Sequence, residues 1–124
     1  MVKWFNLAIG GIIGTFARYI LAGLIHNFLG TDFPYGTLVV NLSGCFLIGF
    51  LSALAEDKFL LEHNARLLLM VGFCGAYTTF STFMLETSNL LKDGENIRAF
   101  ANFSASIIIG FIVFKLGVLL GKII

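Results

Sequence analysis

Residues Gly72 to Phe83 read GFCGAYTTFSTF, a run unlike an ordinary apolar helix. Two glycines precede two pairs of hydroxyl residues, and Phe80 and Phe83 lie three positions apart, so a helix places both rings on one face. We expect Gly72 and Gly75 to loosen a helix here, and the hydroxyl groups to satisfy the backbone groups that a break frees. At membrane depth such a break must be buried in protein or border a cavity, and its free carbonyls suit a hard cation such as Na⁺.

The sequence around this run is too apolar for a water-soluble domain. Of its 124 residues, 58% are hydrophobic and 12% are charged, and the mean hydropathy is +0.95. A soluble domain carries about 25% charged residues. The formal net charge of +1 offers no basic surface for nucleic acid.

Charged residues divide the chain into four apolar stretches, each close to the roughly 20 residues that cross a bilayer as a helix. They cover residues 4–25, 33–55, 67–91 and 99–121. We therefore predict an all-α membrane protein, with a single four-helix transmembrane domain over residues 1–124 and a third helix broken near its middle. The two histidines, His26 and His63, fall in the connections, where we expect them to be solvated.

The charges outside the spans give only a weak preference for one orientation in the membrane. Four spans place both termini and the second connection on one side, with Lys3, Lys58, Arg66 and Lys122. The other side holds Lys92 and Arg98, and Arg18 lies toward that end of its span. Such a chain either inserts in both orientations, so that two copies pair antiparallel, or keeps one orientation fixed by the four cations.

Small and polar residues recur every four positions on three of the predicted helices. They are Gly10, Gly14, Arg18 and Ala22 on the first span, Asn41, Cys45 and Gly49 on the second, and Asn102, Ser106 and Gly110 on the fourth. This spacing puts each set on one helical face, where small residues let backbones approach closely. Ordinary helix packing explains the glycines, whereas the polar groups must face protein or water because lipid offers them no partner.

Three charged residues lie inside the predicted spans. Arg18 is either a structural anchor or a functional charge, because a central arginine costs about 2.5–3.5 kcal/mol on insertion scales. Lys115 is close enough to a helix end to extend its ammonium group to the interface. Glu86 either lies in water or lines an aqueous approach.

The aromatic pair of the third span also has two interpretations. Phe80 and Phe83 either pack as core residues or present ring edges, which carry partial positive charge, to an anion beside the hydroxyls of Ser81 and Thr82. No metal-ligand cluster, nucleophile–base pair or phosphate loop is visible in the sequence. The pattern therefore does not predict an enzyme.

The run Gly72–Phe83 resembles the signature of the Fluc/CrcB fluoride channels. The first-span residues Gly10-Gly11, Gly14 and Arg18-Tyr19, and the run GTLVVN at 36–41, are similar to that family as well. The resemblance covers essentially the whole chain. It implies a fluoride-selective channel that exports F⁻ passively from the cytoplasm across the inner (plasma) membrane and relieves fluoride toxicity. It also implies an antiparallel dual-topology homodimer with a structural Na⁺ at its centre.

The same resemblance implies roles for individual residues. The fluoride pore would be lined by Asn41, Phe80, Ser81, Thr82, Phe83 and Ser106. Arg18 would lie near a wet vestibule, Glu86 matches the acidic residue after the aromatic pair, and the carbonyls of Gly75 and Thr78 would bind the Na⁺. The chain departs from the family on the fourth helix. There Asn102 replaces a frequent tyrosine, and Gly110 and Phe114 offer no hydroxyl, so the polar track is undefined in this region.

The main alternative is a small four-span drug/proton antiporter, a class that is also often dual-topology. Such a carrier needs a membrane-buried carboxylate that exchanges a proton for a cationic drug, typically in its first span. Here the only candidate is Glu86, near the end of the third span, and Arg18 in the first span would repel a cation. The partners that the resemblance implies are fluoride and a second copy of the chain. The apolar spans imply the lipid bilayer, and the small net charge argues against nucleic acid.

Overall fold

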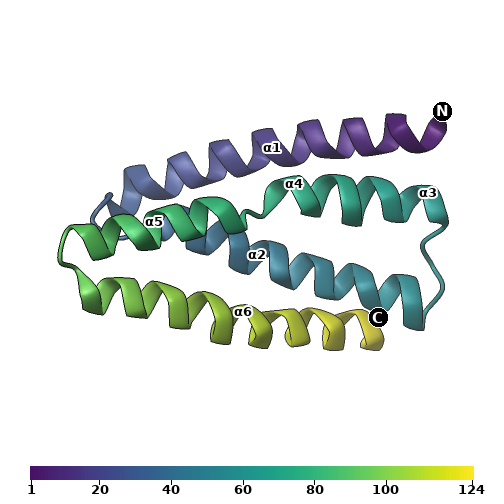
Figure 1. Cartoon of the computed structure of the whole chain (residues 1–124). Helices are drawn as coiled ribbons and strands as arrows, with labels where there is room; N and C mark the ends of the chain where they lie inside the picture. Colours follow the sequence, from purple (N-terminus) through teal and green to yellow (C-terminus); the bar gives the residue numbers. More distant parts are fainter.

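The computed structural model describes all residues, 1–124, and is built from four long helical spans (Figure 1). The first span is α1, Val2–Leu29, and the second joins α2, Tyr35–Ser52, to the π-helical segment η1, Ala53–Asp57. The third comprises four segments: α3 (His63–Arg66), the π-helical η2 (Leu67–Cys74), α4 (Gly75–Tyr77) and α5 (Phe80–Lys92). The fourth is α6, Asn96–Ile123. All four spans are long and apolar enough to cross a membrane, which confirms the predicted class.

The helices extend beyond the apolar stretches that predicted them. The first continues to Leu29 instead of residue 25 and ends where Gly30 adopts a φ of +86°, with its N–H donating to the carbonyl of His26 at 2.8 Å. His26 therefore lies in the last turn of α1, and His63 opens α3, so neither occupies a connection as predicted. Hydropathy locates the part of a helix that suits lipid, whereas turn residues such as Gly30 set its end.

The third span is broken near its middle, as predicted, but at a different residue. The chain is helical through Gly72 and Gly75 as far as Tyr77. It then becomes extended at Thr78 (φ −89°, ψ 156°) and Thr79 (φ −146°, ψ 116°) before α5 begins (Figure 1). Gly72 instead permits close packing, because a Cβ there would lie 3.1 Å from the Cα of Gly10 on α1. The break therefore lies beyond both glycines, and the chain around Gly72 is π-helical.

Two pairs of spans pack closely, and small residues allow it. α2 lies against α6, and α1 lies against η2 and α4, in the first half of the third span. A Cβ on Gly14 would lie 3.2 Å from the Phe73 carbonyl carbon, and one on Gly117 would lie 3.0 Å from the Phe50 nitrogen. The glycine stripes are thus packing faces, as the ordinary interpretation of the sequence held.

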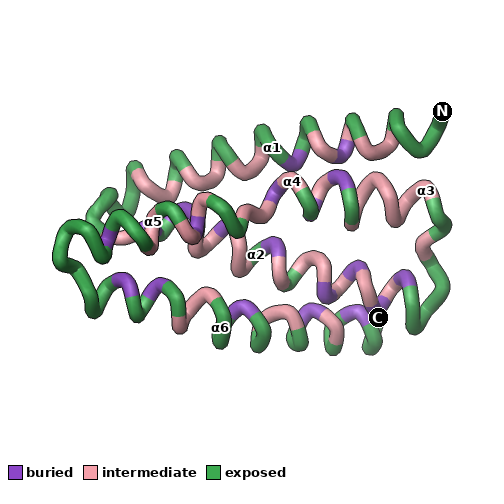
Figure 2. The backbone as a smooth tube through the Cα atoms, viewed as in Figure 1, coloured by how far each residue is buried: buried purple, intermediate pink, exposed green.

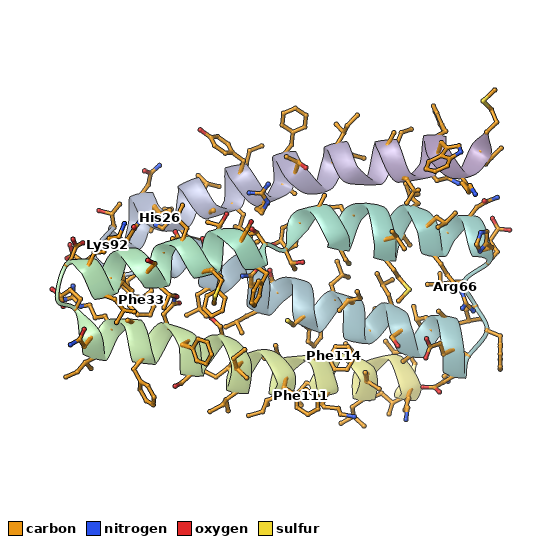
Figure 3. All side chains as sticks on the ribbon, viewed as in Figure 1. His26, Phe33, Arg66, Lys92, Phe111 and Phe114 are labelled. Atoms are coloured by element: carbon orange, nitrogen blue, oxygen red, sulfur yellow. The ribbon has the colours of Figure 1, made fainter.

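The outer surface of the bundle is apolar and the ends are polar. Only 21 of the 124 residues are buried, and exposed residues run along the outer sides of α1 and α6 (Figure 2). Lipid is the surrounding that such a surface requires. Both termini and the second connection lie at one end (Figure 1), where Arg66 donates to the carbonyls of Ala55 (2.6 Å) and Leu61 (3.1 Å) (Figure 3). This layout is the one expected for an even number of spans.

Candidate functional site

The break in the third span is held by Asn41, a residue of α2. Its Nδ2 group donates to the carbonyl of Thr79 at 3.0 Å, and its Oδ1 atom accepts from the N–H of Thr79 at 2.8 Å. One amide side chain thus pairs both backbone groups of an extended residue, as a neighbouring strand would. A free N–H and C=O at this depth would each cost several kcal/mol. Asn41 therefore stabilises the extended conformation directly.

Threonine hydroxyls bond to the backbone on both sides of the break, and one of them satisfies a freed backbone group, as predicted. Thr78 donates its Oγ1 proton at 3.0 Å to the carbonyl of Cys74, which also accepts from the Thr78 N–H at 3.1 Å. Thr79 caps the second half, because its Oγ1 accepts from the N–H of Thr82 at 3.3 Å. Gly44 of α2 makes room for this arrangement, since a Cβ there would collide with the Thr78 methyl group.

The break leaves the carbonyls of residues 75–78 without their usual helical partners. In a continuous helix the Gly75 carbonyl would accept from the N–H of Thr79, which here donates to Asn41. The Thr78 carbonyl would accept from the N–H of Thr82, which here donates to the Thr79 hydroxyl. Gly75 is exposed, with no neighbouring atom within 4 Å of a Cβ built on it. Gly75 and Thr78 are the two of these four residues whose carbonyls the sequence resemblance assigns to a cation.

Arg18 reaches the same region from α1. Its Nε donates to the carbonyl of Ala76 at 3.1 Å, so it supplies a partner to a carbonyl at the C-terminal end of α4. A cation at this end also complements the helix dipole. The structure thus gives Arg18 an anchoring contact.

An open groove with a volume of about 440 Å³ runs beside the break. It is lined by six of the predicted site residues: Asn41, Gly75, Thr78, Phe80, Phe83 and Ser106. The Ser106 Oγ atom is buried and has no hydrogen-bond partner within the chain. The groove therefore combines apolar walls with polar atoms that still have bonding capacity.

The two phenylalanines of the groove differ in exposure. Phe80 is 70% exposed, whereas Phe83 is 3% exposed. Their ring centroids lie 5.8 Å apart at an interplanar angle of 67°, an edge-to-face arrangement. On its other side Phe83 stacks on Phe103 of α6, at 6.0 Å and 27°.

Four other predicted site residues lie outside the lining of the groove. Ser81 is exposed on the first turn of α5, and Thr82 donates its N–H to the Thr79 cap. Arg18 contacts Ala76 behind the break.

Glu86 lines a separate polar pocket of about 340 Å³ at the end of the bundle opposite the termini, together with His26 (Figure 3). Glu86 Oε1 and His26 Nδ1 are both buried there without a partner.

The fourth helix contributes polar groups over only part of its length. Asn102 is 2% exposed and donates to the Thr87 hydroxyl, a contact that the sequence did not predict. Farther along, Gly110 packs near Cys45, and the Phe114 backbone packs against Gly49. Lys115 is exposed, with its ammonium 5.6 Å from the centre of the Phe111 ring. This half of α6 therefore packs against α2 and offers no hydroxyl.

Comparison with known proteins places the chain in a family. Residues 5–118 match the family described as CrcB-like protein, Camphor Resistance (CrcB). A relative from Solidesulfovibrio magneticus is 45% identical over 118 residues, which cover 95% of this chain and 94% of the relative. A relative from Chlorobaculum tepidum is 49% identical over 114 residues, covering 92% and 90%. Both relatives are named fluoride-specific ion channel FluC. With a match over nearly its whole length and identities well above 30%, this chain belongs to the CrcB-like family.

Proposed function

We propose that this chain is a passive, fluoride-selective channel, and that two antiparallel copies in the cell's inner (plasma) membrane close the groove into a pore. The single observation that carries the proposal is the set of polar and aromatic side chains brought together at the break. Asn41, Phe80, Phe83 and Ser106 come from three different spans and line one groove. Two relatives named as fluoride-specific channels share 45% and 49% of their aligned residues with the chain.

The groove has the chemistry that a small, strongly hydrated anion requires. Fluoride can leave water only where hydrogen-bond donors replace its hydration shell. Asn41 Nδ2 has a second hydrogen beyond the one given to Thr79, and the Ser106 hydroxyl has no partner in the chain. The edges of Phe80 and Phe83 add partial positive charge. Ser81 and Thr82, which flank the groove on α5, supply further hydroxyls along the path. Each of these groups is neutral, so each holds the ion weakly enough for release.

A second copy of the chain is the partner that completes this site. In one copy the groove is open, Phe80 is 70% exposed, and Gly75 has open space before it. The weak charge difference between the two ends supports insertion in both orientations. An antiparallel copy would cover the open side of each groove and would bring the two breaks together.

The free carbonyls of the break fit a structural Na⁺ between the two copies. Hard cations prefer oxygen ligands, and unwound backbone carbonyls are a known type of Na⁺ ligand in membrane proteins. Gly75 and Thr78 of each copy would give four carbonyl oxygens. When bound, the ion supplies positive charge that offsets the negative ends of two α4 helices.

Removal of sodium is expected to weaken the dimer. Protein prepared throughout in N-methyl-D-glucamine salts should show a lower melting temperature and a larger monomer fraction than protein prepared in sodium salts. Restoring sodium should reverse both changes. Size-exclusion chromatography with thermal unfolding checks this, and identical behaviour in the two salts would contradict a sodium site at the break.

Asn41→Asp is expected to slow fluoride flux by at least about tenfold. A carboxylate in the groove repels the anion, and at about 4 Å two like charges cost about 4 kcal/mol even at an effective dielectric of 20. Aspartate also loses the amide donor to Thr79. Asn27→Asp, the same change at an exposed position of α1, is the control. Flux through Asn41→Asp equal to or faster than wild type would refute the role of Asn41.

The function itself is tested by fluoride efflux from proteoliposomes. A channel releases fluoride when valinomycin lets potassium follow, because charge must be balanced, and it does not need a proton gradient. An antiporter would instead respond to a proton gradient alone. No carboxylate lies in the first span, and Glu86 lies in a polar pocket at one end of the bundle, so we expect the channel result.

A further inference from the structure

A buried polar contact joins the fourth helix to the second half of the third span. Asn102 of α6 is 2% exposed and is one of only two buried polar residues in the chain. Its Nδ2 donates to the Thr87 hydroxyl of α5 at 2.9 Å. Neither residue lines the groove. The contact therefore needs an explanation other than direct binding of an anion.

Thr87 also forms a hydrogen bond with the backbone of Phe83, and so connects Asn102 to it. The Thr87 hydroxyl donates to the Phe83 carbonyl at 2.8 Å. A hydroxyl has one hydrogen, so when its oxygen accepts from Asn102, that hydrogen remains directed at Phe83. The three groups form a continuous relay from α6 to a residue that lines the groove.

The ring of Phe83 is held from the same helix. Phe103, next to Asn102 in the sequence, stacks on Phe83 with centroids 6.0 Å apart. Phe83 in turn meets Phe80 edge to face at 5.8 Å. Adjacent residues of α6 thus contact both the backbone turn and the ring of Phe83.

Because the third span is broken, α5 needs contacts of its own to fix its position in the bundle. In a continuous helix, α4 would fix the height of α5 in the bundle, but the extended Thr78 and Thr79 remove that constraint. Asn41 fixes the start of α5 through Thr79, and the Asn102–Thr87 bond fixes it two turns farther on. From this geometry we infer that Asn102 is a positioning residue: through Thr87 it sets the place of Phe83 in the groove. The inference rests on the proposed channel function.

Two near-isosteric variants, Asn102→Leu and Thr87→Val, remove the link to α6, and Thr87→Ser keeps the hydroxyl. Because functional groups must be held within about 0.5 Å, we expect the first two to reduce fluoride efflux by about tenfold and to lower the fluoride-to-chloride efflux ratio. Thr87→Ser should retain both values. The double variant Asn102→Leu/Thr87→Val should be no worse than the more severe single variant, since both break one relay.

A second readout does not depend on transport. The full-length chain carrying 4-fluorophenylalanine at position 83 reports the ring's surroundings by ¹⁹F NMR. The resonance should shift in Asn102→Leu and Thr87→Val and stay in place in Thr87→Ser. If the unsubstituted protein released no fluoride, the proposed function would fail while these shifts still decided whether Asn102 positions Phe83.

The inference is overturned if Asn102→Leu and Thr87→Val keep wild-type efflux and selectivity, if their effects add in the double variant, or if the ¹⁹F resonance does not move. If Asn102→Leu does not assemble, Thr87→Val and Thr87→Ser test the inference by the same criteria. Thr87→Val keeps the size of threonine without its hydroxyl, whereas Thr87→Ser keeps the hydroxyl and loses a methyl group, so a defect found only in Thr87→Val reports the hydroxyl.

Discussion

Fluoride flux is expected to fall at least about a hundredfold when Phe80 or Phe83 is replaced by isoleucine, an increase in barrier of about 2.7 kcal/mol. Isoleucine is apolar and of comparable bulk, but it has no ring edge with partial positive charge. The two rings are 5.8 Å apart and both line the groove. If they help to replace water around the anion, the loss of either ring leaves a part of the pore where nothing replaces the ion's hydration water.

The two variants differ in their structural cost, which makes Phe80→Ile the cleaner test. Phe80 is 70% exposed in one chain, so its removal leaves the fold of that chain nearly unchanged. Phe83 is 3% exposed and stacks on Phe103, so Phe83→Ile also loses packing. Phe100→Ile, at a 73% exposed position of α6 that does not line the groove, is the matched control. Dimer elution on size exclusion shows assembly, and wild-type flux through assembled Phe80→Ile would remove the aromatic pair from the pore.

The second large effect concerns the fold. Gly117→Ala is expected to destabilise the protein by about 1–3 kcal/mol or more, because the added methyl group meets backbone and not a movable side chain. The new Cβ would collide with the Phe46 carbonyl oxygen and would lie 3.0 Å from the Phe50 nitrogen. α2 and α6, which pack against each other, would have to separate at this point.

Gly23→Ala is the matched control for this change. Gly23 lies inside α1, is exposed, and has no atom within 4 Å of a Cβ built on it. Alanine is a better helix former than glycine by about 1 kcal/mol, so this variant should be neutral or slightly more stable. Thermal unfolding of both variants in the same detergent measures the difference. Equal melting temperatures would show that α2–α6 contact does not depend on the absence of a side chain at Gly117.

Sequence reasoning predicted the elements of this protein well because hydropathy and spacing are local properties. Four apolar stretches predicted four spans, and the run GFCGAYTTFSTF predicted a break with threonines satisfying its ends. The structure confirms the four spans and the break, and one threonine, Thr79, satisfies a freed N–H by capping α5.

The exact position of the break could not be predicted from the sequence because it depends on a distant residue. The chain leaves the helix at Thr78 and Thr79 where Asn41, 38 positions earlier, can pair both backbone groups of Thr79. Glycine content suggested Gly72 and Gly75, yet Gly72 serves contact with α1. Likewise, His26 was assigned to a connection because polarity, and not helix termination at Gly30, guided the boundary.

The candidate site was predictable because motifs on several spans resemble those of a known family. Asn41, Phe80, Phe83 and Ser106 were singled out from the sequence, and all four line the groove. The supporting contacts were not, because the Asn102–Thr87 pair joins two helices whose relative height no periodicity reveals. A buried asparagine in an apolar span was the only available signal.

The most direct test of the account measures fluoride and chloride release from the same vesicles. Vesicles containing the purified full-length chain are loaded with equal amounts of potassium fluoride and potassium chloride, and valinomycin is added while two ion-selective electrodes record both anions. If paired grooves dehydrate and pass fluoride, that ion leaves rapidly while chloride stays inside. Retention of both anions, or their release at the same rate, would contradict it.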